Sequence, residues 1–146
     1  MCATAFVLLE DTLAEARDSQ RIGDMAAMRR ALELYYIDHG TYPEVAFANS
    51  AVAMWGELKG ELQPYISQLP IDPLNDPSRR VEETGAFNYS YRSLRDGNDY
   101  VLIFRLEQPA ASHMHSHADV GITTTHGTFT FFDLTGVEGI FSLSAP

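Results

Sequence analysis

Apolar residues recur every three or four positions through the first quarter of the chain, with charged residues between them. This spacing places them on one face of a helix and predicts a single long helix over residues 3–39. No proline interrupts the run. Gly40 can end the helix in the left-handed conformation, and Pro43 prevents it from continuing. The apolar positions are Phe6, Leu9, Leu13, Ala16, Ile22, Met25, Met28, Leu32 and Tyr35 or Tyr36.

The predicted helix is about 50 Å long at 1.5 Å per residue, which exceeds what a domain of this size needs to cover its core. We expect Ile22, Met25, Leu32 and Tyr35, in the second half, to belong to the core of the domain itself. The first half needs some other partner.

A second, shorter helix is predicted over residues 50–67, with Ser50 as its cap and Trp55, Leu58 and Leu62 on its apolar face. Three prolines in the following nine residues, 69–77, indicate an ordered loop with little conformational freedom.

The pattern then changes to strands. Aromatic residues alternate with polar ones over residues 87–91, and residues 100–106 form a more continuous apolar run. Asp96-Gly97 between them suits the positive-φ positions of a hairpin turn. A second hairpin is predicted between residues 119–125 and 128–134.

Residues 140–143 add a last short strand, and residues 108–118 form a loop. The order of elements predicts one α+β domain over residues 1–146, in which the long N-terminal helix packs against an antiparallel sheet of about four strands within residues 87–144. The helix over 50–67 is its second, short helix.

Charge and cysteine content narrow the function. Twenty acidic residues against 10 basic ones give a net charge of -10, which argues against nucleic-acid binding through a general basic patch. Cys2 is the one cysteine, so no intramolecular disulfide can form. No apolar run reaches the roughly 18 residues that span a bilayer, so we expect a soluble monomer.

Two passages resemble a known family. Residues 16–25 (ARDSQRIGDM) and 31–43 (ALELYYIDHGTYP), followed by Leu-Pro-Ile-Asp-Pro at 69–73, are similar to the helix and loop of bacterial type IV pilins and type II secretion pseudopilins, closest to the G-like pseudopilins. Residues 3–9 resemble the tail of the hydrophobic segment with which that family begins. The leader, the cleavage site and the rest of that segment are not in the sequence, so the chain is expected to begin inside it.

The resemblance implies a pilin-like fold and a structural role: a subunit of a type IV pilus or a type II secretion pseudopilus that self-assembles through its N-terminal helix. The implied partners are identical or related pilin subunits and the assembly machinery, with no nucleic acid. The implied location is the periplasmic or extracellular side of the bacterial cell envelope, anchored in the inner membrane before assembly. Pilus and pseudopilus, and major and minor subunit, remain open.

The residues expected to carry assembly are Phe6, Leu9 and Leu13, because an apolar stripe at the free end of a helix needs neighbouring helices or a membrane. The alternative for the same residues is an ordinary helix face packed on the sheet.

Metal ligands offer a second class of site. His113, His115 and His117 alternate, so in an extended chain they project from one side and could bind Zn²⁺ or Cu²⁺, but we favour an exposed polar loop as their explanation. Asp72, Asn75 and Asp76 are oxygen ligands of the kind Ca²⁺ prefers, but we favour turn and capping roles for them. The resemblance makes calcium a conceivable cofactor without assigning its ligands, and no metal site is predicted firmly.

Catalysis has little support, because no phosphate-binding loop, nucleophile elbow or His-Glu-x-x-His helix is present. We therefore expect a protein that is not an enzyme. The alternative to the filament subunit is a pilin-derived surface module that uses loops over residues 108–127 to bind a metal, a glycan or a protein.

Overall fold

The structure, a computed structural model, describes residues 2–45, 48–50, 53–79, 85–108, 122–124, 127–129 and 140–144, with side chains from residue 9 to residue 108 of these ranges. Its elements are a 38-residue helix α1 (Cys2–His39), a short helix α2 (Met54–Leu62) and six strands. The α+β class and the long N-terminal helix are confirmed. Gly40, at φ 75°, donates its N–H to the carbonyl of Tyr36 and ends α1 where the sequence predicts.

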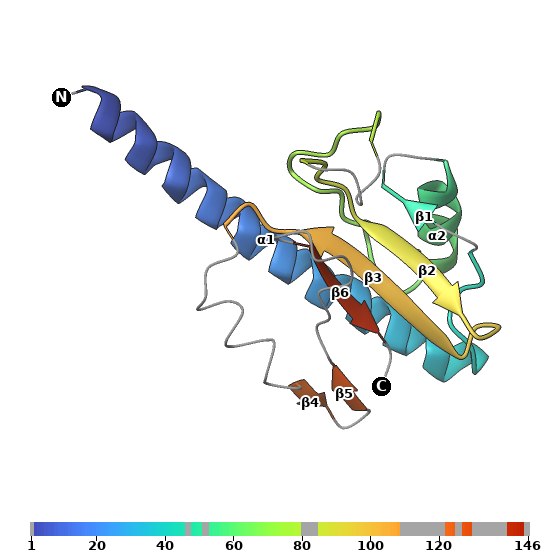
Figure 1. The fold of residues 1–146 in the computed structure, drawn as a ribbon. Coiled ribbons are helices and arrows are strands. Elements are labelled where there is room, and N and C mark those ends of the chain that lie inside the picture. The colour runs from blue at the N-terminus through green and yellow to red at the C-terminus, as the bar shows by residue number, and fades with distance from the viewer. Residues whose placement is uncertain are drawn as a thin grey trace.

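The main sheet is antiparallel, in the order β1 (Ala48–Asn49), β2 (Ser90–Leu94), β3 (Asp99–Arg105) and β6 (Ile140–Ser144). It lies along one side of α1, and α2 sits beside β1 and β2 (Figure 1). Strands β4 (Ile122–Thr124) and β5 (Gly127–Phe129) pair only with each other.

The prediction of about four sheet strands within residues 87–144 is therefore wrong. Only three strands of that range join the main sheet, because the second hairpin forms a separate pair and β6 takes the place beside β3. The remaining, two-residue strand β1 comes from the segment before α2, where no strand was predicted.

The hairpin between β2 and β3 is confirmed. Arg95, Asp96 and Gly97 all have positive φ angles, of 51°, 54° and 78°. Gly97 also packs closely on the segment that follows α1: its carbonyl accepts the Tyr42 N–H at 2.7 Å, and a Cβ there would lie 3.0 Å from Cβ of Thr41. A larger residue at position 97 would therefore be strained in its backbone and crowded by Thr41.

Helix α2 is shorter than the predicted 50–67, and Ser50 is not its cap. The Ser50 hydroxyl instead donates to Oδ1 of Asn75 at 2.6 Å and accepts the N–H of Tyr89 at 2.9 Å. The helix ends before Pro64, after which Tyr65 and Ile66 both donate their N–H to the Leu62 carbonyl in a tight turn.

The core lies between α1, α2 and the sheet, and it is rich in aromatic residues. Met25 and Leu32 of α1 are buried in it, as predicted, while Ile22 and Tyr35 are partly buried against it. Tyr89, Tyr91 and Tyr100 are completely buried. The other core members are Met28, Ala31, Tyr42, Val45, Ala48, Trp55, Leu58, Leu62, Leu69, Leu102, Phe104 and Leu106.

Candidate functional site

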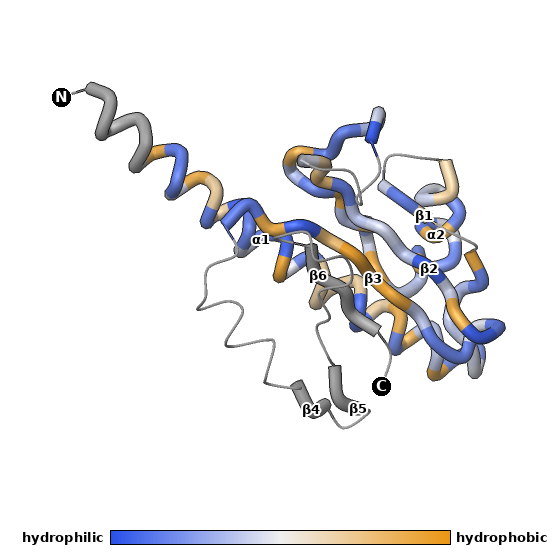
Figure 2. The backbone as a smooth tube through the Cα atoms, in the orientation of Figure 1, coloured by the Kyte–Doolittle hydropathy of each residue, from blue (hydrophilic) through white to orange (hydrophobic). Residues whose placement is uncertain are grey.

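The N-terminal part of α1 extends past the sheet and past α2 (Figure 1). Two apolar residues there, Leu9 and Leu13, are 55% and 48% accessible to solvent. Figure 2 shows hydrophobic and hydrophilic residues interleaved along the coloured part of the projecting helix. Leu9 and Leu13 are therefore not part of a helix face packed on the sheet, which was the alternative explanation for them. The side chain of Phe6 lies outside the described residues.

From Leu9 onward, where side chains are described, the first buried residue of α1 is Ala14, followed on the same side by Asp18 and Arg21. Asp18 and Arg21 are almost inaccessible although both are charged, at 1% and 0% exposure. Buried charges are costly unless they are paired and hydrogen-bonded, so their partners decide whether this part of the fold is stable.

Arg21 has those partners on two distant segments. Its Nε and Nη2 donate to the two carboxylate oxygens of Asp72 at 2.7 and 3.0 Å, in the forked geometry that suits a guanidinium. Its Nη1 donates to Oδ1 of Asp18 at 2.7 Å and to Oε1 of Glu107 at 2.6 Å. The ring of Phe87 lies 4.6 Å from the centre of the guanidinium. We call Asp18, Arg21, Asp72 and Glu107 the charged anchor.

The anchor also satisfies the backbone where the chain leaves β3. Asp18 accepts the N–H groups of Glu107 and Gln108 at 3.0 and 2.9 Å. Glu107 accepts further hydrogen bonds from the guanidinium of Arg17, which hold the pKa of its carboxyl below the ordinary value. α1 is thereby fixed at one position to the proline-rich loop and to the end of β3.

These contacts also set the pKa of Arg21. Burial alone would lower it, but the hydrogen bonds that Arg21 donates to Asp72 and Glu107 outweigh the burial, so the pKa is raised and the guanidinium stays charged. The anchor is an arrangement for holding the helix in place. On its N-terminal side, Ala14 is still buried and Asp11 accepts a hydrogen bond from the Gln108 side chain at 3.1 Å.

The anchor was missed by the sequence analysis, although a signal for it exists. Asp18 and Arg21 are three residues apart on the same helical face as Met25, Met28 and Leu32, which are all buried. Charged residues within a buried stripe must have partners, but Asp72 of the loop was considered as a metal ligand or a turn and capping residue, and not as the partner of a buried arginine.

The predicted calcium candidates are engaged with protein groups. Asp72 belongs to the charged anchor, and Asn75 accepts the Ser50 hydroxyl. Asp76 accepts the N–H and the hydroxyl of Ser78 at 2.9 and 2.6 Å, and these hydrogen bonds lower the pKa of its carboxyl. In the part of the chain that the structure describes, no three His, Cys, Asp or Glu residues are grouped closely enough to hold a metal ion.

His113, His115 and His117 lie outside the described residues, as does most of the segment 108–127 that was predicted to bind a partner.

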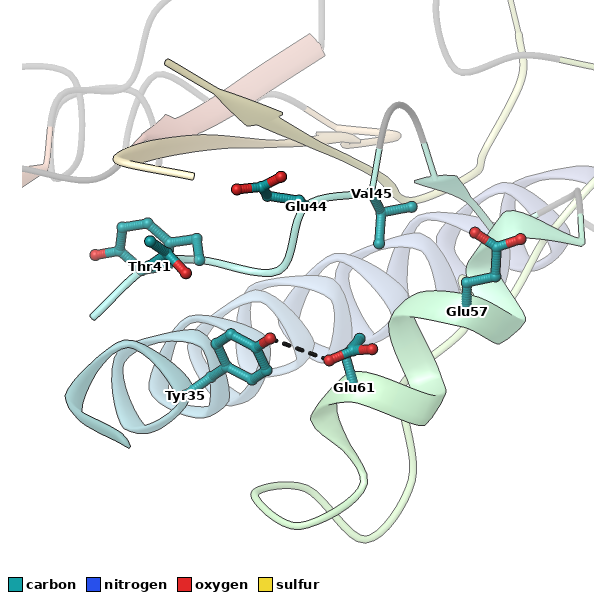
Figure 3. A pocket seen from close by; sticks show the side chains of 7 residues that line it. Tyr35, Thr41, Glu44, Val45, Glu57 and Glu61 are labelled. Carbon is teal, nitrogen blue, oxygen red and sulfur yellow. Dashed lines mark hydrogen bonds between the residues drawn. The ribbon is translucent and has the colours of Figure 1, made fainter. Parts of the chain in front are cut away.

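An acidic groove lies between the end of α1, the segment after it and α2 (Figure 3). It has a volume of about 520 Å³, and Glu44, Glu57 and Glu61 line it together with Tyr35. The Tyr35 hydroxyl donates to Oε2 of Glu61 at 3.0 Å, which ties α1 to α2 across the groove. No local sequence pattern indicated that these three carboxylates would meet.

Comparison with known proteins gives no match: no protein-family profile, no curated protein and no solved structure corresponds significantly to this chain. Within the described ranges, no helix combines the length and the hydropathy needed to cross a bilayer.

Proposed function

We propose that this chain is a structural filament subunit of the type IV pilin or type II secretion pseudopilin kind, and not an enzyme. Its partners are copies of itself or related subunits in the bacterial cell envelope. The observation that carries the proposal is the projecting part of α1, on which Leu9 and Leu13 are exposed at 55% and 48%.

The charged anchor supports the same proposal. A helix of 38 residues is about 57 Å long, and a subunit that assembles through one end of such a helix must hold the other end rigidly. Arg21 does this through ionic contacts to Asp72 and Glu107, and the core packing of Met25, Met28 and Leu32 continues it. The projecting part is therefore presented at a fixed angle to the domain.

The test is cross-linking in the organism that encodes the chain, expressed from its own gene. We expect brief formaldehyde treatment to give a ladder of multimers that contain the wild-type chain. The double variant Leu9→Gln/Leu13→Gln should lose the ladder, because glutamine preserves helix propensity but removes the apolar contact.

The matched control is Ile71→Gln, which makes the same kind of change at a residue that is 49% exposed in the proline-rich loop. It should keep the ladder. The proposal is overturned if the wild-type chain gives no ladder, if Leu9→Gln/Leu13→Gln leaves the ladder intact, or if Ile71→Gln removes it equally.

A further inference from the structure

The outward side of α1 carries its own stripe of apolar and small residues, separate from the buried one. The buried residues are spaced alternately by four and three positions: Ala14, Asp18, Arg21, Met25, Met28 and Leu32. Residues with the same spacing on the opposite side of the helix define the outward stripe: Leu9, Leu13, Ala16, Gln20, Gly23, Ala27, Arg30, Leu34 and Ile37.

The outward stripe is exposed to solvent at every position except Ala27, which is partly buried. Leu34 and Ile37, at its C-terminal end, are 42% and 67% exposed, comparable to Leu9 and Leu13 at the other end. Alternation of three and four is the spacing of a seam between two packed helices. Because the sheet covers the other side of α1, a second helix can lie on this stripe without meeting the sheet.

Large and small side chains follow one another in nearly the same order whether the stripe is followed from its N-terminal or from its C-terminal end. Large apolar residues stand at each end, and the middle, from Ala16 to Ala27, holds small residues apart from Gln20. Two copies in antiparallel orientation would pack Leu9 against Leu34 of the other copy and Ala16 against Ala27, with Gln20 facing Gly23. Large residues then meet large ones at both ends, and the helices approach closely at the centre.

The charge of Arg30 favours the antiparallel orientation over a parallel one. Arg30 lies on the stripe and is exposed. In a parallel pair in register, two Arg30 side chains would face each other, which is unfavourable. In the antiparallel pair, the aliphatic part of Arg30 lies over Leu13 of the other copy, with the exposed carboxylate of Glu10 about one helical turn away.

We propose that the domain pairs with a second copy of itself in antiparallel orientation through the outward stripe of α1, in place of the soluble monomer that the sequence predicts. The pairing does not depend on the proposed filament. The two proposals share Leu9 and Leu13, and only the pairing uses Leu34 and Ile37.

Disulfide trapping of the purified chain, in a Cys2→Ser background, tests the orientation. The variant Leu9→Cys/Leu34→Cys should give a covalent dimer on mild oxidation. Neither single variant should do so, because residue 9 of one copy would lie about 38 Å from residue 9 of the other. Glu15→Cys/Leu34→Cys is the matched control: Glu15 is exposed but lies off the stripe, and this variant should remain uncross-linked.

The proposal is overturned if the wild-type chain sediments as a monomer at high concentration, or if the single variants cross-link as readily as the double one. Leu34→Gln/Ile37→Gln separates the two proposals: it should abolish the dimer and leave the multimer ladder in cells unchanged. Since each chain carries a net charge of -10, the dimer should also strengthen as salt is added.

Discussion

The outward and the buried sides of α1 carry apolar residues at the same helical spacing, yet they have opposite surroundings. Leu13 is 48% exposed, whereas Leu32 is completely buried. Leu13 belongs to the outward stripe, whereas Leu32 lies on the side of the helix that also carries Asp18 and Arg21 of the charged anchor. An apolar stripe thus indicates that a face needs a partner, and the buried charges mark the face that finds its partner within the same chain.

The largest expected effect is that of Arg21→Ala, which removes the cation common to three carboxylates. It should lower the free energy of unfolding by about 3–5 kcal/mol, because the carboxylates of Asp18 and Asp72 would remain buried without their cation. Urea unfolding followed by circular dichroism measures it. Arg30→Ala on the outward side is the control and should change stability by less than about 0.5 kcal/mol. Equal losses for both variants would remove the distinction between the two faces.

Leucine truncation compares the two regions directly. Leu32→Ala should cost about 2–5 kcal/mol, because it leaves a cavity in a completely buried site. Leu13→Ala should cost less than about 1 kcal/mol in dilute solution, where its side chain is half exposed. Thermal unfolding of both variants at one low concentration gives the comparison. A loss for Leu13→Ala as large as that for Leu32→Ala would show that Leu13 is packed within the monomer.

Glu107→Gln tests how the contribution of the charged anchor to stability depends on pH. The folded-state pKa of Glu107 lies below its ordinary value because of the hydrogen bonds from Arg17, so its contribution to stability is present above that ordinary value, 4.5. The contribution is lost as pH falls through the lowered pKa. The variant should be less stable than wild type by about 1–2 kcal/mol at pH 7, and the gap should close in acid. Denaturant melts at several pH values measure the gap, and a gap independent of pH would contradict this assignment.

The smallest expected effect on stability is that of Asp24→Asn, which should raise the free energy of unfolding where the preceding variants lower it. Burial raises the pKa of Asp24, against the hydrogen bond that it accepts from the Tyr89 hydroxyl at 2.8 Å. A carboxyl with a raised pKa contributes stability at low pH and loses it as pH rises through that pKa.

Asparagine keeps the acceptor oxygen and cannot ionise. Between pH 4 and pH 7, Asp24→Asn should therefore become more stable than wild type, by less than about 1 kcal/mol in free energy of unfolding. The same denaturant melts measure this difference. A variant that loses stability relative to wild type over that range would show that the ionised carboxylate is needed.

The sequence predicted those elements that local chemistry determines. Residues 3–39 lack proline and end at Gly40, so α1 could be assigned almost to the residue, and Asp96-Gly97 located the first hairpin. The sheet was harder to predict, because β6 pairs with β3 across 34 intervening residues and the pattern of each strand does not identify its neighbour. The exposed Leu9 and Leu13 could be predicted from helix length. The contacts of Arg21 with Asp72 and Glu107 join residues far apart in the sequence, and no local pattern contains them.

The charged anchor has a consequence for the order in which the chain folds. Arg21 and Glu107 are separated by 86 positions, so the guanidinium leaves the ribosome long before its last carboxylate does. At ordinary rates of synthesis the delay is about 4–17 s. During that time α1 can form as a helix, but it cannot dock permanently, because docking would bury an incompletely paired charge. The final seating of the helix must therefore wait for the end of β3, which makes it a late step in the maturation of a newly made subunit.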